Sequence, residues 1–148
     1  MGSVTDQPPA PGPLEEALAR VGDRWSLLVV DALLEGPRRF NELSQDLPGI
    51  ASNVLSQRLR HLEAERIVVA RPYSGRPVRF AYELSAEGRQ LAGALRLLTQ
   101  WGLDHGAGAH EPAAPEHEAC GSVLEVRWYC PTCDRAVEED EPATLRFL

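Results

Sequence analysis

The sequence predicts a mainly α-helical domain that carries one small β-hairpin and is followed by a small, separate C-terminal unit. Three observations predict this arrangement. Apolar residues recur at helical spacing through most of residues 14–101, two short runs rich in β-branched and aromatic residues flank a Pro/Gly turn, and all three cysteines follow residue 119. A chain of 148 residues has room for one such domain and an appendage.

Three predicted helices form the first half of the domain. The first covers residues 14–20, and the second covers residues 24–35 with Asp23 as its candidate N-cap. Gly36 and Pro37 end the second helix, because neither residue favours a helix interior. The third helix is expected over residues 39–47, where a Pro-Gly turn follows.

A fourth helix, ending near Glu65, has two chemically different faces. Leu55, Leu59 and Leu62 fall on one side of a helical wheel, and Asn53, Gln57 and Arg60 fall on the opposite side, flanked by Ser56 and His61. Amide and guanidinium groups form bidentate hydrogen bonds with adenine and guanine in the major groove of DNA. This pattern indicates a DNA-reading helix, with an ordinary solvated helix as the alternative.

A hairpin and a closing helix complete the domain. Residues 67–71 and 78–84 have strand composition, and residues 72–77 (PYSGRP) have turn composition. Ser85 is the expected cap of one closing helix, whose apolar face is Leu91, Leu95, Leu98 and Trp101. The order of elements, with a tight turn between helices three and four and a hairpin after them, is that of a winged helix-turn-helix.

Charge is unevenly distributed along the chain. The net charge is −7, yet residues 38–79 hold eight arginines and four acidic residues, whereas residues 102–148 hold three arginines and ten acidic residues. All basic residues are arginines. The positive charge therefore lies where a winged helix would meet double-stranded DNA.

The segments outside the domain predict its flanking regions and the cellular location of the protein. Residues 1–13 read as a disordered lead-in without the features of a signal peptide, and residues 102–115 as a Gly/Ala/Pro linker. No apolar run approaches the roughly 20 residues that cross a bilayer, so no membrane association and a cytoplasmic location are expected.

Together these stretches resemble the HxlR-type winged-helix transcription regulators of bacteria, which are distant relatives of the MarR group. The matching pieces are GDRWSLLVVDALLEGPRRFNELSQDLPGI, LSQRLRHLE and the Tyr-x-Leu-Ser-x-x-Gly run at residues 82–88. The resemblance implies a homodimer joined through its terminal helices and a palindromic operator. The expected function is sequence-specific DNA binding by a dimeric repressor, whose small-molecule effector the sequence does not identify.

The DNA-binding candidates come from the helix pattern, the hairpin and the resemblance. Arg58 is either a phosphate contact or the ion-pair partner of an acid on a neighbouring helix, and Arg76 and Arg79 at the hairpin tip are minor-groove or phosphate candidates, with a solvated loop as the alternative. The resemblance implies Arg38 and Arg39 near the DNA backbone. The candidate set is Arg38, Arg39, Ser52, Asn53, Ser56, Gln57, Arg58, Arg60, Arg76 and Arg79.

The sequence also departs from the family pattern. Ala51 stands where the family usually has a capping Ser or Thr, so Ser52 is expected to take over the cap and shift the helix start by one residue. Arg66 stands where the family usually has a Gly in the left-handed region, at an expected cost of about 1 kcal/mol. The N-terminal cysteine of redox-sensing members is absent, which argues against that route of sensing.

Residues 116–148 are predicted to form a zinc-ribbon-like β unit stapled by a metal. His117-x-x-Cys120 and Cys130-Pro-Thr-Cys133 match a tetrahedral Cys₃His zinc site, with residues 122–129 as a joining strand. His110, Glu118 or water are alternatives for the fourth ligand, and a redox Cys-x-x-Cys or unmetalled thiols are alternatives to zinc.

The sequence has features of two rival functions. A zinc deaminase needs His-x-Glu and Pro-Cys-x-x-Cys, but here His117 directly precedes Glu118 and Pro131 follows the first cysteine of the pair. No enzymatic activity and no catalytic residue are therefore expected. The other rival is a zinc-ribbon adaptor that binds another protein and uses the winged helix as a dimer scaffold.

Overall fold

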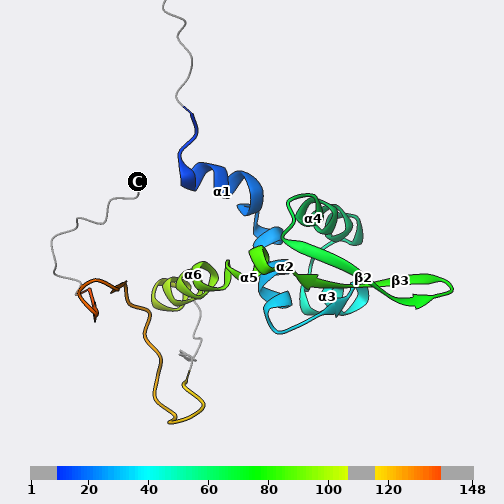
Figure 1. Cartoon of the computed structure of the whole chain (residues 1–148). Helices are drawn as coiled ribbons and strands as arrows, with labels where there is room; N and C mark the ends of the chain where they lie inside the picture. The colour runs from blue at the N-terminus through cyan, green and yellow to red at the C-terminus, as the bar shows by residue number, and fades with distance from the viewer. Residues whose placement is uncertain (1–9, 107–115, 138–148) are drawn as a thin grey trace, which may run out of the picture. The chain divides into compact units, whose positions relative to one another are not determined.

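The computed structural model describes residues 10–106 and 116–137, and its chain divides into two compact units, one ending at Arg96 and the other beginning at Leu97 (Figure 1). Of the predicted lead-in at residues 1–13 and the predicted linker at residues 102–115, residues 1–9 and 107–115 lie outside the described residues, as does the segment 138–148. The elements in chain order are α1 (Pro13–Val21), α2 (Arg24–Leu34), β1 (Arg38–Arg39), α3 (Phe40–Asp46), α4 (Ser52–Ala64), β2 (Val68–Gly75), β3 (Val78–Leu84), α5 (Ala86–Arg89), α6 (Ala92–His105), β4 (Tyr129–Cys130) and β5 (Arg135–Ala136).

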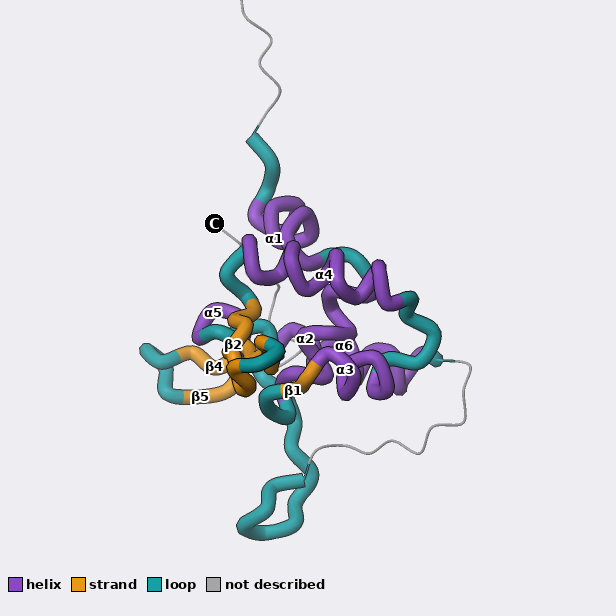
Figure 2. The backbone as a smooth tube through the Cα atoms, turned by 90° about the vertical axis from the view of Figure 1, so that its right-hand side faces the viewer, coloured by secondary structure: helices purple, strands orange, loops and turns teal. Residues whose placement is uncertain are grey.

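The core of the first unit lies where α4 packs against α2, with α3 beside them (Figure 2). Leu55, Leu59 and Leu62 of α4 are at most 1% exposed. Val29 and Val30 of α2 are fully buried against them. The predicted leucine ridge of the fourth helix is therefore confirmed.

Three antiparallel strands form a small sheet in the order β1-β3-β2. The two-residue strand β1 was not predicted, because its pairing with Tyr82 and Ala81 depends on a strand more than forty residues later. The third helix consequently begins at Phe40 and not at Arg39. The predicted winged helix-turn-helix order of elements is otherwise present.

The hairpin is longer than predicted. Strand β2 runs through Pro72 to Gly75, where the sequence predicted a turn from Pro72 onward. Proline is tolerated there because β2 is an edge strand of the sheet. The pairing register shifts between Pro72 and Ser74, so that Tyr73 is the extra residue of a β-bulge.

The two ends of α4 differ in how their backbone groups are satisfied. At its start, Ala51 is the N-cap without a side-chain hydrogen bond and Ser52 is already helical, so the prediction that Ser52 caps this helix is wrong. At its end, the N–H of Ile67 donates to the Leu62 carbonyl at 2.9 Å and that of Arg66 donates to the Glu63 carbonyl at 3.0 Å. This is a Schellman motif, and the φ of 60° at Arg66 confirms the predicted left-handed residue.

The predicted single closing helix is two helices, because residues 90–91 form a turn between α5 and α6. The predicted cap is present: Ser85 Oγ accepts from the Gly88 N–H at 3.0 Å and donates to the Arg66 carbonyl at 2.6 Å. A Cβ at position 88 would lie 2.3 Å from the Ile67 carbonyl oxygen, so only glycine fits there. Helix α6 continues past Trp101 to His105.

Beyond α6, the second unit has little regular structure. Strands β4 and β5 pair with each other, and Glu116 and Val123 form an isolated bridge. The expected strand over residues 122–129 is wrong, since the backbone between this bridge and β4 is irregular. No described helix of the chain has the length and apolar character of a bilayer-spanning segment.

Candidate nucleic-acid interface

Helix α4 presents its polar face to solvent. Ser52, Asn53, Gln57 and Arg60 are exposed and Ser56 is half-buried. Within the described ranges, the side chains of Asn53 and Gln57 form no hydrogen bond, so their amide groups are available to a ligand. The structure thus brings the predicted base-reading side chains together on one open helix face, opposite the buried leucines.

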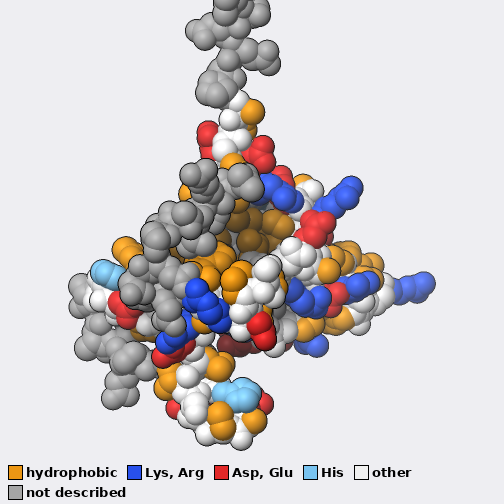
Figure 3. Space-filling view, turned by 60° about the vertical axis from the view of Figure 1, so that its left-hand side comes forward, with side chains coloured by type: hydrophobic (Ala, Val, Ile, Leu, Met, Phe, Trp, Pro, Cys, Tyr) orange, Lys and Arg blue, Asp and Glu red, His pale blue; other side chains and the backbone are white. Residues whose placement is uncertain are grey.

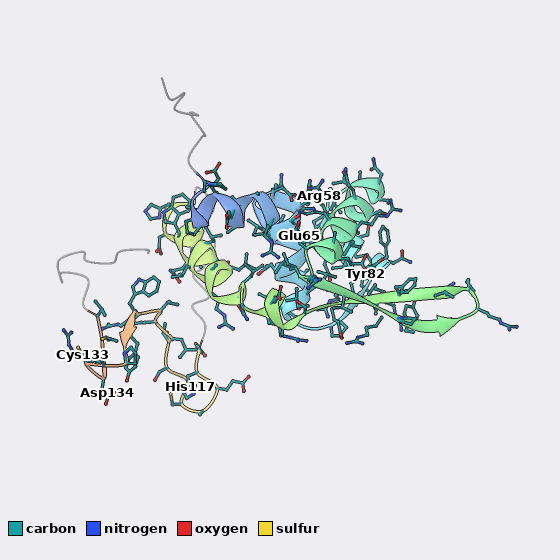
Figure 4. The ribbon with its side chains drawn as sticks, turned by 45° about the horizontal axis from the view of Figure 1, so that its top comes forward. Arg58, Glu65, Tyr82, His117, Cys133 and Asp134 are labelled. Carbon is teal, nitrogen blue, oxygen red and sulfur yellow. The ribbon has the colours of Figure 1, made fainter. Side chains whose placement is uncertain are left out.

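Arg58 belongs to the packing of α4 against α2. Its Nη1 lies 3.1 Å from Oδ2 of Asp23, and its side chain is 24% exposed. Of the two alternatives that the sequence left open, the structure therefore shows the ion pair. Figure 4 shows Arg58, together with Glu65, on the side of α4 that faces the neighbouring helices.

Asp23 forms contacts with both α2 and α4. Its Oδ1 accepts from the backbone N–H groups of Trp25 and Ser26, each at 3.1 Å, which confirms the predicted N-cap of α2. Burial raises the pKa of Asp23, but the hydrogen bonds from Ser26 and the Arg58 guanidinium outweigh burial and hold that pKa below its ordinary value. Asp23 is therefore charged at neutral pH and fixes the start of α2 to the middle of α4.

The two adjacent arginines of β1 have different surroundings. Arg38 lies 2.8 Å from Glu35 and 3.2 Å from Asp46, and its side chain is 27% exposed. Arg39 is exposed, and its guanidinium carbon lies 4.4 Å from the centre of the Tyr73 ring. Arg38 is thus held by carboxylates, whereas Arg39 keeps its charge available for an anion.

The hairpin carries further basic side chains, and Figure 3 shows basic groups out to its far end. Arg76 lies in the turn and Arg79 lies on β3, and both are exposed. Arg71 on β2 pairs with Glu83 at 2.8 Å. The two tip arginines therefore remain candidates for phosphate or minor-groove contact, as the sequence predicted.

A link between α1 and α4 was missed by sequence reasoning. Arg20 Nε lies 2.7 Å from Glu65 Oε2, Arg20 Nη2 donates to the Glu65 carbonyl at 2.9 Å, and His61 Nε2 lies 2.8 Å from the Arg20 carbonyl oxygen. The hydrogen bond with Glu65 raises the pKa of Arg20. No local signal could have found contacts between residues more than forty positions apart.

The predicted zinc ligands form two separate pairs in the second unit. His117 Nδ1 lies 3.2 Å from Cys120 Sγ, and hydrogen bonds from Ser122 and His117 lower the pKa of Cys120. Hydrogen bonds from Cys133 lower the pKa of Cys130. Figure 4 shows His117 and Cys133 apart, and nowhere in residues 10–106 and 116–137 do three His, Cys, Asp or Glu side chains gather as a metal-binding group.

The chain is similar to helix-turn-helix transcriptional regulators over most of its length. The profile of the HxlR-like helix-turn-helix family matches residues 20–109. The HTH-type transcriptional regulator Mb3122 of Mycobacterium bovis, which is itself uncharacterised, is 36% identical over 125 residues, which are 82% of this chain and 77% of the relative.

Solved structures show the same likeness. The protein PA1607 has a TM-score of 0.71 at 31% identity, over 88% of this chain and 96% of that chain. A MarR-family regulator from Enterococcus faecalis has a TM-score of 0.55 at 35% identity, over 62% of this chain and 83% of that chain.

Proposed function

Because the chain belongs to the HxlR-like helix-turn-helix family of DNA-binding transcriptional regulators, which is not a family of enzymes, we propose that it is a dimeric repressor of a palindromic operator. The observation that carries the proposal is the open polar face of α4 above a fully buried leucine ridge. On this proposal the protein acts in the cytoplasm.

The exposed side chains of α4 suit the major groove. Asn53 and Gln57 have the amide geometry that reads adenine, and Arg60 has the fork that reads guanine. Arg76 and Arg79 on the hairpin then reach the adjacent phosphates or the minor groove. Arg38 and Arg58, being paired with carboxylates, contribute by orienting their elements.

Apolar side chains on the terminal helices support a homodimer. Leu14 and Leu18 of α1 are 72% and 54% exposed, and Leu98 and Trp101 of α6 are 55% and 63% exposed. Exposed apolar groups at helical spacing are stabilised when a partner covers them. In the proposed dimer, two copies of α4 enter successive major grooves about 34–36 Å apart, and the bound protein blocks a promoter.

The contacts of Arg20 with Glu65 and His61 support a route for regulation. They fasten the last turn of α1 to the last turn of α4, so a shift of the dimer helices would be passed to the DNA-reading helices. An effector that favours one spacing of those helices would change operator affinity by population shift.

The operator proposal is tested by selecting bound sequences from a random DNA pool and measuring the mass of the complex. We expect a palindrome whose half-sites lie one helical turn apart, bound by two chains. Absence of any sequence preference would overturn the proposal. Capture of a protein partner without DNA selectivity would favour the adaptor.

We also propose that His117, Cys120, Cys130 and Cys133 bind one zinc ion. The donor types suit zinc, each pair is already close, and no residue in 116–137 is buried, so this segment lacks a hydrophobic core of its own. Elemental analysis of the full chain, purified without chelator, should find about one zinc per chain. We expect Cys130→Ser to lose it, and a zinc content near zero in the wild type would refute the proposal.

A further inference from the structure

Arg39 reaches across the sheet to an aromatic partner. Arg39 pairs with Ala81 of β3, and Ala81 pairs with Arg71 of β2, so these three residues form one row across the sheet. Tyr73 lies on β2, with β3 between it and Arg39. The Arg39 side chain therefore spans the middle strand to place its guanidinium 4.4 Å from the centre of the Tyr73 ring.

The position of Tyr73 depends on the β-bulge. The register shift between Pro72 and Ser74 leaves Tyr73 without a partner on β3. A bulge changes the direction of the side chain that it carries and bends its strand. Tyr73 is 43% exposed, so packing in the core does not explain its position, whereas the guanidinium contact does.

An aromatic partner leaves an arginine ready for a phosphate. A ring contacts the flat face of the guanidinium, while its N–H donors point outward along the edge. The Glu42 carboxylate accepts the backbone N–H of Arg39 at 2.6 Å, and no described carboxylate forms a salt bridge with the Arg39 side chain. Arg38, with two carboxylate partners, has no such freedom.

We propose that Tyr73 is a positioning residue for DNA-backbone binding, because its ring holds the Arg39 guanidinium in the orientation that contacts a phosphate. This inference rests on the proposed function. A phosphate contact is independent of sequence, so a short duplex of mixed sequence serves as the probe and the operator need not be known. Affinity of the full chain for that duplex is measured over a range of salt concentrations.

Four variants separate the ring, the hydroxyl and the charge. Tyr73→Ala is expected to weaken binding about two- to five-fold, the equivalent of about 0.5–1 kcal/mol for an exposed cation–π pair, and to flatten the salt dependence. Tyr73→Phe keeps the ring and should bind as the wild type does. Tyr73→Leu fills similar apolar space without a π face and should resemble Tyr73→Ala. Combined with Arg39→Ala, Tyr73→Ala should add no further loss.

The chain offers a matched control. Arg24 lies 4.7 Å from the ring centre of Trp25, which is the other cation–π pair in the described ranges, and it belongs to α2 and not to α4 or the hairpin. Arg24→Ala removes the same charge and the same kind of contact, and should leave the salt slope unchanged. Thermal unfolding of each variant confirms that the folded state is being compared.

The outcomes are distinguishable. Additive losses in the double variant, or a loss in Tyr73→Phe equal to that in Tyr73→Ala, would overturn the positioning role while leaving the regulator intact. An unchanged duplex affinity in Tyr73→Ala would also overturn the positioning role and leave the proposed function standing. A wild-type chain that binds no duplex at any salt concentration would overturn the proposed function and this inference together.

Discussion

Replacing Asp23 with alanine removes two supports of the DNA-reading helix at once. The carboxylate accepts two backbone N–H groups at the start of α2, and loss of such a cap costs about 1 kcal/mol. It also pairs with Arg58 across side chains that are 38% and 24% exposed, which limits the pair to about 0.2–1 kcal/mol. We therefore expect Asp23→Ala to lower the free energy of unfolding by about 1–2 kcal/mol.

The Asp23→Asn variant and the pH dependence of stability separate the contribution of the helix cap from that of the ion pair. Asparagine caps helices as well as aspartate does, so Asp23→Asn should lose only the ion-pair part. The folded pKa of Asp23 lies below its ordinary value, so the unfolded chain binds this proton more tightly. The stabilisation is therefore complete above the ordinary pKa of about 3.9 and disappears as the pH falls through the lower folded pKa.

Urea unfolding followed by circular dichroism, from neutral pH down to about pH 3, measures both effects. The difference between wild type and Asp23→Ala should stay constant down to about pH 5 and shrink below about pH 4. Equal stability of the two proteins at neutral pH would refute the reasoning. So would a difference that grows as the solution is acidified.

Three further predictions concern α4. Arg60→Ala should weaken operator binding by about 1–3 kcal/mol and relax one base position, which a gel-shift titration against single-base operator variants measures; an unchanged affinity would contradict major-groove docking. Arg66→Gly should raise the free energy of unfolding by up to about 1 kcal/mol, because glycine tolerates the φ of 60°. Urea unfolding measures this change, and a lower free energy of unfolding would mean that the contacts of the Arg66 side chain outweigh the backbone strain. Ala51→Ser should stabilise the folded state by about 1 kcal/mol, because it supplies the missing side-chain cap of α4. Ser52→Ala alters no cap and should change the midpoint of thermal unfolding little. Equal shifts of that midpoint in the two variants would contradict Ala51 as the N-cap position.

Most of the fold could be predicted because its signals are local. The three-and-four spacing of Leu55, Leu59 and Leu62 specifies a buried face within one helix, and Asp23 and Ser85 act on backbone groups two or three residues away. The predictions were wrong where the local sequence signal was weak or where pairing with a distant strand overrode it. Pro72 indicated a turn, yet an edge strand accommodates it because no neighbouring strand needs its N–H.

The site could be predicted only in part. The helical period alone placed Asn53, Gln57 and Arg60 on the open face of α4. It could not decide between the two roles of Arg58, because the deciding partner, Asp23, is 35 positions away. The zinc site stays a prediction: its cysteine and histidine spacing is clear in the sequence, and the structure shows the two ligand pairs apart.

The sequence by itself determined which faces are apolar, which residues cap α2 and α5 and where arginine accumulates, since each depends on neighbours within about one helical turn. Only the tertiary structure decided which arginines are free. Arg38, Arg39 and Arg58 are identical in chemistry, but two are neutralised by carboxylates and one rests on a tyrosine ring. The physical reason is that an ion pair or a stacked ring depends on distance in space, which the order of residues along a chain does not specify.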